Sequence, residues 1–337
     1  MLRVGDDDSS CLKRLGVKLY FYTTYGLTIA SELALPELLK VEPTDTPDVR
    51  ILLRPVSEVL EGAEPQHSYF EALGDVCQFS AKGVARYRIE QGCRIFIDRN
   101  VSPVPELEAT DSAVRLYLLG TALGTILHQR RWLPLHVSAI AAPSGVWAFT
   151  GPSGAGKSTL VAWLNYRQNW PLVSDDVAVL KPKDDLPYLY SGPSRLKLWK
   201  DALSAIGIKN NGLARDLTRA DKYHLYSHQK FQLEPQLLKN LVILDRANKG
   251  EPANLKLLQG MEAFKAAMAS IYRPELGIQF NSQEQLFSQI ADLGEKITVY
   301  QYRRPWGLAT MDTSLQALIQ PMQQPDKLKE RAITIKR

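Results

Sequence analysis

One stretch decides the fold that this sequence predicts: Gly151-Pro152-Ser153-Gly154-Ala155-Gly156-Lys157-Ser158. It matches G-x-x-x-x-G-K-[ST], the phosphate-binding loop (Walker A motif) of nucleoside triphosphate enzymes. Glycines let backbone N–H groups turn inward around phosphate oxygens, which a β-carbon would obstruct. In such a loop Lys157 reaches the β- and γ-phosphates and the Ser158 hydroxyl ligates magnesium. The alternative is a glycine-rich turn with an incidental lysine.

The residues on both sides of this stretch favour the phosphate-binding interpretation. Val146–Thr150 is an apolar run, typical of a buried strand that enters the loop. Thr159–Leu164 has the pattern of a helix that leaves it, with its N-terminal dipole directed at the phosphates. We therefore expect the segment from Gly151 to Thr159 to bind a nucleotide triphosphate.

Composition indicates an ordinary globular chain with two domains. The chain has 337 residues, of which 45% are hydrophobic and 23% charged, and its net charge is +5. No run of eighteen apolar residues occurs, so we expect no membrane insertion. The acidic beginning has no apolar stretch and does not resemble a secretory signal. Cys11, Cys77 and Cys93 show no metal-ligand spacing and are expected to be free thiols in a cytoplasmic protein.

A short basic tail accounts for much of the positive charge. Residues 326–337 contain five Lys or Arg. The two interpretations are a nucleic-acid contact and a solvated chain end. No aromatic interleaving or DNA-binding motif accompanies the tail, so we expect no nucleic-acid partner.

Residues 1–110 are expected to form a β-rich domain that would help to hold a peptide substrate. The predicted strands are Val17–Thr24, Leu27–Glu32, Asp48–Leu53, Val76–Phe79, Val84–Ile89 and Cys93–Ile97. Two prolines make 101–106 a natural linker. A helix with Asp111 or Ser112 as its cap is predicted over 111–128, where it opens a second domain at 111–325.

The second domain is predicted to have a mixed sheet around the phosphate loop. His136–Ala142 leads through a turn at 143–145 into the strand that enters the loop, which is the pattern of an antiparallel hairpin. A plain doubly wound fold would reach its loop through a parallel crossover. The fold class is therefore α/β (α+β), with a partly antiparallel sheet.

Asp175 and Asp176 interrupt the apolar strand predicted over 171–180. Burying two adjacent carboxylates without partners is costly, so we expect a cation beside them. One carboxylate could hold magnesium and the other could accept the proton of an attacking hydroxyl. The alternative is a pair of solvated turn residues at the end of a strand.

His136 lies at the start of the predicted hairpin, which returns the chain to the loop. There its imidazole could form a hydrogen bond with Asp175 and bias the protonation of that carboxylate. A lone histidine is also commonly a packed residue.

These motifs together resemble the kinase core of the HPr kinase/phosphorylase family, which belongs to the phosphoenolpyruvate carboxykinase-like superfamily. The resemblance rests on Leu135-His136, on the loop 151–158 and on Ser174-Asp-Asp176, in that order. Tyr25–Glu32, Leu35–Leu38, Tyr117–Gly120 and Leu133–His136 also resemble the HPr-kinase-like proteins of peptide maturation, including lasso-peptide tailoring kinases. The similarity is concentrated in residues 112–181.

The resemblance implies specific roles. Asp175 would take the serine proton, His136 would be its partner, and Asp176 and Ser158 would hold Mg²⁺. A homo-oligomer is also implied. The family's downstream metal-binding glutamate and catalytic-loop arginine are not placed in this sequence.

A cationic group follows further along the chain. Ser194–Lys200 alternates basic and apolar residues, which would put Arg195 and Lys197 on one strand face. Lys222 and His224 lie in a second such segment. Arg195 and Lys222 above all could clamp the γ-phosphate, or the group could form a pocket for a peptide carboxylate. The remaining alternative is a basic strand face in water. Arg273 could supply a further positive charge to the transition state.

The expected function is an ATP-dependent kinase that phosphorylates a serine on a peptide or protein. A small-molecule kinase is one alternative, and a nucleotide-operated switch without a phosphoryl acceptor is another.

Overall fold

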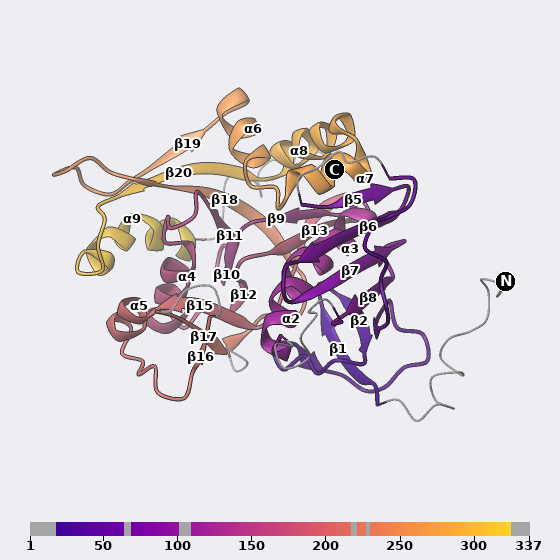
Figure 1. The fold of residues 1–337 in the computed structure, drawn as a ribbon. Coiled ribbons are helices and arrows are strands. Elements are labelled where there is room, and N and C mark those ends of the chain that lie inside the picture. Colours follow the sequence, from indigo (N-terminus) through magenta and orange to yellow (C-terminus); the bar gives the residue numbers. More distant parts are fainter. Residues whose placement is uncertain (1–17, 64–68, 101–108, 217–220, 227–229, 325–337) are drawn as a thin grey trace. The chain divides into compact units, whose positions relative to one another are not determined.

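The computed structural model describes residues 18–63, 69–100, 109–216, 221–226 and 230–324. The chain forms two compact units, Met1–Arg130 and Arg131–Arg337 (Figure 1). Cys77 and Cys93 are free thiols, as expected. Cys11, the expected linker at 101–106 and the basic tail at 326–337 lie outside the described residues.

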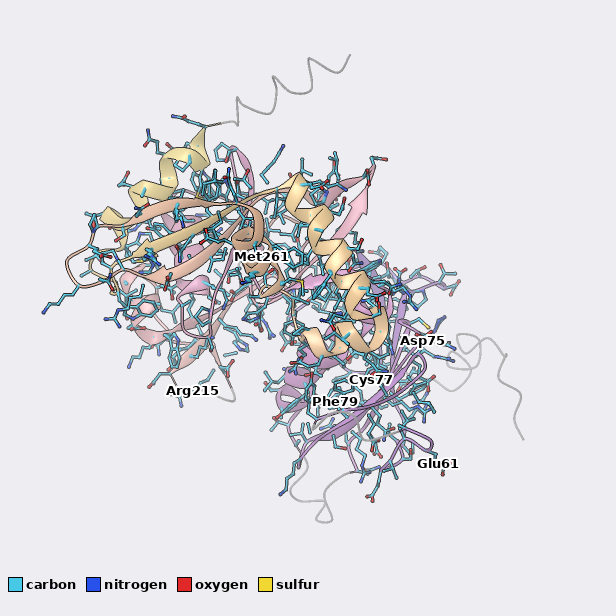
Figure 2. The ribbon with its side chains drawn as sticks, turned by 90° about the horizontal axis from the view of Figure 1, so that it is seen from above. Glu61, Asp75, Cys77, Phe79, Arg215 and Met261 are labelled. Atoms are coloured by element: carbon cyan, nitrogen blue, oxygen red, sulfur yellow. The ribbon has the colours of Figure 1, made fainter. Side chains whose placement is uncertain are left out.

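The first unit is built on one mixed sheet of eight strands in the order β3-β1-β2-β4-β8-β7-β6-β5. The strands are β1 (Tyr20–Thr24), β2 (Leu27–Ser31), β3 (Leu39–Lys40), β4 (Val49–Leu53), β5 (Glu71–Leu73), β6 (Val76–Ala81), β7 (Ala85–Glu90) and β8 (Arg94–Asp98). Each strand predicted in this part of the chain is present, within a few residues. Figure 2 shows Cys77 and Phe79 on β6, where both side chains are buried.

The helical segment after this sheet packs with the first unit. It consists of α2 (Asp111–Tyr117), a π-helical turn at 118–122 and α3 (Leu123–Gln129). The Tyr87 hydroxyl donates a hydrogen bond to the carbonyl of Val114 at 2.9 Å, and the Gln129 amide donates to Asp75 and Ile89. The division between the units therefore follows the helices, whereas the sequence places it before them. The cap also differs: the Thr110 side chain accepts from the N–H of Ala113.

The second unit contains the loop at 151–156. Its strands are β9 (Leu133–Leu135), β10 (Ser138–Ala142), β11 (Gly145–Thr150), β12 (Leu172–Ser174), β13 (Ala178–Lys183), β14 (Leu186–Tyr190), β15 (Arg195–Trp199), β16 (Ala214–Arg215), β17 (Lys222–Tyr226), β18 (Gln236–Arg246), β19 (Asn254–Leu258) and β20 (Thr298–Arg304). Its helices are α4 (Lys157–Arg167), α5 (Lys200–Ala205), α6 (Gly260–Met268), α7 (Pro274–Asn281), α8 (Gln283–Lys296) and α9 (Met311–Gln323).

The main sheet of this unit is mixed, as predicted. Its strands run in the order β12-β10-β11-β18-β14-β13-β9, with β20 paired to β18 and β19. β10 and β11 form the expected antiparallel hairpin, while β11, β18 and β20 are parallel neighbours. The carboxyl ends of these three strands therefore meet at one edge. β15, β17 and β16 form a separate small sheet.

Both faces of the main sheet are covered, which explains why β11 is apolar throughout. Trp147 and Phe149 pack into a core with α4 and α9, while Val146 and Ala148 pack into a second core with α6 and α8 (Figure 1). Alternate residues of a strand face opposite sides of the sheet, so a doubly covered strand has no polar face. Within the described residues, no helix has both the length and the apolar character that crossing a membrane requires.

Candidate active site

The loop that follows β11 has the backbone that the glycine pattern predicts. Gly151, Gly154 and Gly156 have φ values of 143°, 86° and 83°, which glycine adopts far more readily than other residues. A Cβ on Gly151 would lie 3.0 Å from the carbonyl oxygen of Leu244, and one on Gly156 would lie 2.7 Å from Nη2 of Arg304. Glycine at these two positions therefore permits close approach to the neighbouring strands.

Lys157 begins α4 and folds back over the loop. Its ammonium donates to the carbonyl oxygens of Gly151 at 2.8 Å and Pro152 at 3.4 Å. Burial lowers the pKa of this lysine, and the charges of Asp175 and Asp176 partly oppose that shift. Ser158 and Thr159 are half-buried in the first turn of α4. The ammonium thus lies among carbonyl oxygens that a phosphate would replace as partners.

The Asp175–Asp176 step is a break between two strands. β12 ends at Ser174 and pairs with β10, whereas β13 begins at Ala178 and pairs with β9. Asp176 has a φ of 84°, which ends the alternation of a regular strand. Because the chain changes its pairing partner here, both carboxylates can turn toward one side.

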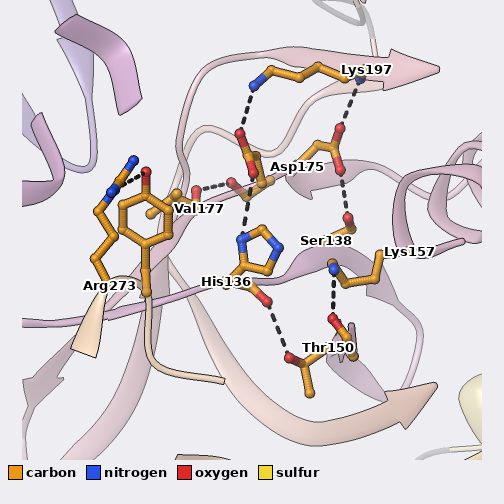
Figure 3. Close-up of polar contacts among 12 residues, drawn as sticks. His136, Ser138, Thr150, Lys157, Asp175, Val177, Lys197 and Arg273 are labelled. Carbon is orange, nitrogen blue, oxygen red and sulfur yellow. Dashed lines mark hydrogen bonds and ion pairs between the residues drawn. The ribbon is translucent and has the colours of Figure 1, made fainter. Parts of the chain in front are cut away.

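Asp175 is held from two directions and is only 5% exposed. Oδ1 accepts from the Ser138 hydroxyl at 2.5 Å, and Oδ2 accepts from the backbone N–H of Lys197 at 2.9 Å (Figure 3). The alternative of a solvated turn therefore does not hold for Asp175.

Asp176 lies between two cationic or potentially cationic side chains. Its Oδ2 is 2.7 Å from the Lys197 ammonium, and its Oδ1 is 3.6 Å from Nδ1 of His136. Burial acts to raise the pKa of Asp176, but Lys197, together with His136 and Arg195, outweighs it and holds that pKa well below its usual range. The expected cation beside the pair is therefore Lys197.

His136 contacts Asp176 and not Asp175, the partner that the sequence analysis assigned to it (Figure 3). The reason lies in the backbone, because β9 ends at Leu135 and the positive φ of Asp176 directs that carboxylate to the connection before β10. Burial lowers the pKa of His136, and the nearby Lys157 charge lowers it further. Both effects favour the uncharged form of the imidazole.

The small sheet brings four basic residues to one face. Lys197 lies opposite His224 and Trp199 opposite Lys222, so alternation places Arg195, Lys197, Lys222 and His224 on the same side. Arg195 is 7% exposed, and the Lys222 charge contributes to the lowered pKa of Lys157. His224 lies 3.4 Å from Asp216. This face is directed at the site, and the alternative of a basic face in water does not hold for Arg195.

Two neighbours of His136 come from the turn before α7. The ring of Tyr272 stacks on the imidazole with 6.1 Å between centroids, and Arg273 donates to the Tyr272 hydroxyl at 3.2 Å. Arg273 has a φ of 46°, an uncommon backbone conformation for a non-glycine residue. Tyr272 and Ser138 were not predicted from the sequence as residues of the site. The position of Ser138, two residues after His136 at the start of the hairpin, is a signal that could have indicated it.

The carboxylates fit magnesium only in combination with phosphate. Within the described ranges, no group of three or more His, Cys, Asp or Glu could hold a metal ion. Magnesium at phosphoryl-transfer sites commonly takes one or two protein ligands and completes its shell with phosphates and water. A hydroxyl at Ser158 and a carboxylate at Asp176 suit that donor set.

Comparisons with known proteins gave matches among solved structures. No family model and no curated protein matches this chain. Among solved structures, the HPr(Ser) kinase/phosphatase from Coxiella burnetii is similar at 12% identity and a TM-score of 0.29, over 56% of this chain and 97% of that one.

Proposed function

We propose that this protein is an ATP-dependent kinase that transfers the γ-phosphoryl group to a serine hydroxyl of a peptide or protein. The observation that supports this most directly is the Asp175–Asp176 pair, which Ser138, Lys197 and His136 hold near Lys157 (Figure 3). A phosphate loop that only switches or hydrolyses does not need a buried Asp175 next to an Asp176 that has its own lysine and histidine. The precursor of a lasso-type peptide is the acceptor class that the sequence resemblance implies.

The donor side is formed by the loop and the first turn of α4. Backbone N–H groups of 151–158 and the Lys157 ammonium would bind the phosphates, exchanging the carbonyl contacts that Lys157 makes now. Ser158 and Asp176 would hold Mg²⁺, which when bound neutralises charge on the β- and γ-phosphates. Arg195 and Lys222, on the basic face of the small sheet, would contact the γ-phosphate.

The acceptor side requires a base. In the transfer, the serine oxygen forms a bond to the γ-phosphorus, the bond to the β,γ-bridging oxygen breaks, and ADP leaves. The serine proton passes to Asp175, whose oxygens each retain a lone-pair position beyond the hydrogen bonds they already accept. Ser138 and Lys197 position that carboxylate.

The test compares two variants of the pair. Asp175→Asn should keep its affinity for MgATP and lose transfer to serine-containing peptides by about 10²-fold or more. Asp176→Asn should weaken the magnesium dependence of nucleotide binding. Transfer is measured as the gain of one phosphate in peptide mass, with serine-to-alanine peptides as the acceptor control. Asp292→Asn is the matched variant, since Asp292 forms an exposed ion pair with Lys296 on α8.

Two outcomes would contradict the proposal. Nucleotide hydrolysis that no peptide changes, with no phosphorylated product, would favour the switch, and phosphorylation of small hydroxyl compounds alone would favour a small-molecule kinase. If Asp175→Asn transfers normally while Asp176→Asn does not, Asp176 is the base.

A further inference from the structure

A cluster of one aromatic and two cationic residues lies where β18 and β20 end. Arg246 and Arg304 are the last residues of these parallel strands and are register partners. Their guanidinium carbons lie 5.9 Å and 5.5 Å from the centroid of the Trp306 ring. None of these residues belongs to the site described above.

Arg304 connects this cluster to the phosphate loop. Its side chain is 5% exposed, and its Nη2 lies 2.7 Å from where a Cβ on Gly156 would be. Within the described residues its hydrogen-bonding contact is with the carbonyl of Pro305 at 3.4 Å, and no carboxylate there forms an ion pair with it. A buried guanidinium without an anion is costly, so its position beside the loop favours an anionic ligand.

Trp306, unlike the buried Arg304, is exposed. Its side chain is 49% exposed, whereas Trp147, Trp163 and Trp170 are at most 9% exposed and pack in the core beside α4. An exposed indole with arginines beside it is a surface on which a flat aromatic group stacks. The cluster thus offers a stacking surface next to a buried cation.

The topology places both features on the path of one ligand. β11, β18 and β20 are parallel neighbours, and the phosphate loop follows β11 directly. Ligands of sheets with parallel strands bind outside the carboxyl ends of those strands. A molecule with its phosphates in the loop and its aromatic ring at Trp306 would lie along this edge of the sheet, next to Arg304.

We propose that Trp306, Arg246 and Arg304 form the site for the base end of the bound nucleotide. The base stacks on Trp306, Arg246 lies beside it, and Arg304 contacts a phosphate oxygen next to Gly156. This inference rests on the proposed nucleotide-binding function and adds the residues that hold the base.

Calorimetric titration with MgATP and with magnesium tripolyphosphate tests the assignment, because tripolyphosphate carries the phosphates without the base. Trp306→Ala should bind MgATP about tenfold more weakly and tripolyphosphate unchanged. Arg304→Gln should bind both ligands more weakly. Arg303→Gln is the matched control, since Arg303 precedes Arg304 on β20, is exposed and pairs with Asp245 at 3.4 Å. Nucleotide should also quench the tryptophan fluorescence of the wild type, and Trp306→Ala should lose much of that quenching.

The outcomes separate this inference from the function it rests on. A wild type that binds neither MgATP nor MgGTP would overturn the proposed function. Normal nucleotide binding with an unchanged affinity in Trp306→Ala would overturn the base site alone. A Trp306→Ala variant that changes the KM for a peptide while leaving nucleotide affinity intact would overturn it as well, and would assign Trp306 to the acceptor.

Discussion

Lys197 links the two carboxylates of the candidate site. Its backbone N–H donates to Asp175, and its ammonium lies 2.7 Å from Asp176. The Lys197 charge lowers the pKa of Asp176, and perturbed pKa values cluster at functional sites. The sequence allowed the Lys197 side chain either to contact phosphate or to lie in solvent. In the structure it forms an ion pair with Asp176.

His136 should make stability depend on pH in a defined direction. The pKa of the folded state is lowered, so the unfolded chain binds a proton more readily. The stability contributed by the neutral imidazole is complete above the unfolded pKa of about 6.5 and is lost as the pH falls from there toward the folded pKa. In urea unfolding, the wild type should therefore lose more stability between pH 8 and pH 5.5 than His136→Gln does.

The groups that face His136 are Lys157, Lys197, Asp175 and Asp176, and all four are present in both proteins. Comparing the two pH profiles therefore isolates the imidazole. Equal losses in the two proteins would show that its pKa is not lowered in the fold.

Among the elements, the glycine-rich loop at 151–156, the β10–β11 hairpin and the interrupted strand at Asp175 follow directly from local sequence. Glycines that need positive φ, a short turn between apolar runs and polar residues within an apolar run are all local signals. The helix predicted over 111–128 is present, but its π-helical turn at 118–122 was not predicted. The apolar periodicity of that segment does not indicate a π-helical turn.

Two glycines of the loop should respond differently to alanine. Gly154 has φ 86° and no atom near a Cβ, so Gly154→Ala should cost about 1 kcal/mol from backbone strain alone. Gly156→Ala should cost about 1 kcal/mol more, because the new methyl group displaces the buried Arg304 guanidinium. Chemical unfolding without nucleotide measures both. Gly207→Ala, at φ 84° in open space outside the loop, is the control that should match Gly154→Ala.

A loss of stability that is the same for Gly154→Ala and Gly156→Ala would show that the Arg304 guanidinium moves away from the new methyl group without cost.

At the scale of the whole molecule, the proposed chemistry belongs to one of the two units. Every residue of the candidate site lies in Arg131–Arg337. The sequence predicts the two-part organisation but places the boundary before the helices. Those helices pack through Tyr87 and Gln129 onto the first sheet, and such long-range hydrogen bonds leave no local pattern.

Nucleotide should protect only the second unit from hydrogen exchange. With MgATP at 100 times its Kd, the second unit should gain about 2.7 kcal/mol, because ligand binds the folded state. Slower exchange is expected in 145–160, in 243–247 and in 304–306, and strands β1 to β8 should exchange as before. Equal protection in the first unit would contradict a site confined to the second.

The sequence by itself determined the strand-loop-helix at 145–167, the mixed sheet beside it and the residue types at the candidate site. These features depend on backbone conformations and on the spacing of apolar residues, and both are determined by a few neighbouring residues. Only the tertiary structure decided that His136 contacts Asp176, that Lys197 holds the carboxylate pair, and that Arg304 lies against Gly156. Each of those contacts joins segments that strand pairing brings together, and the register of distant strands depends on the packing of the whole sheet.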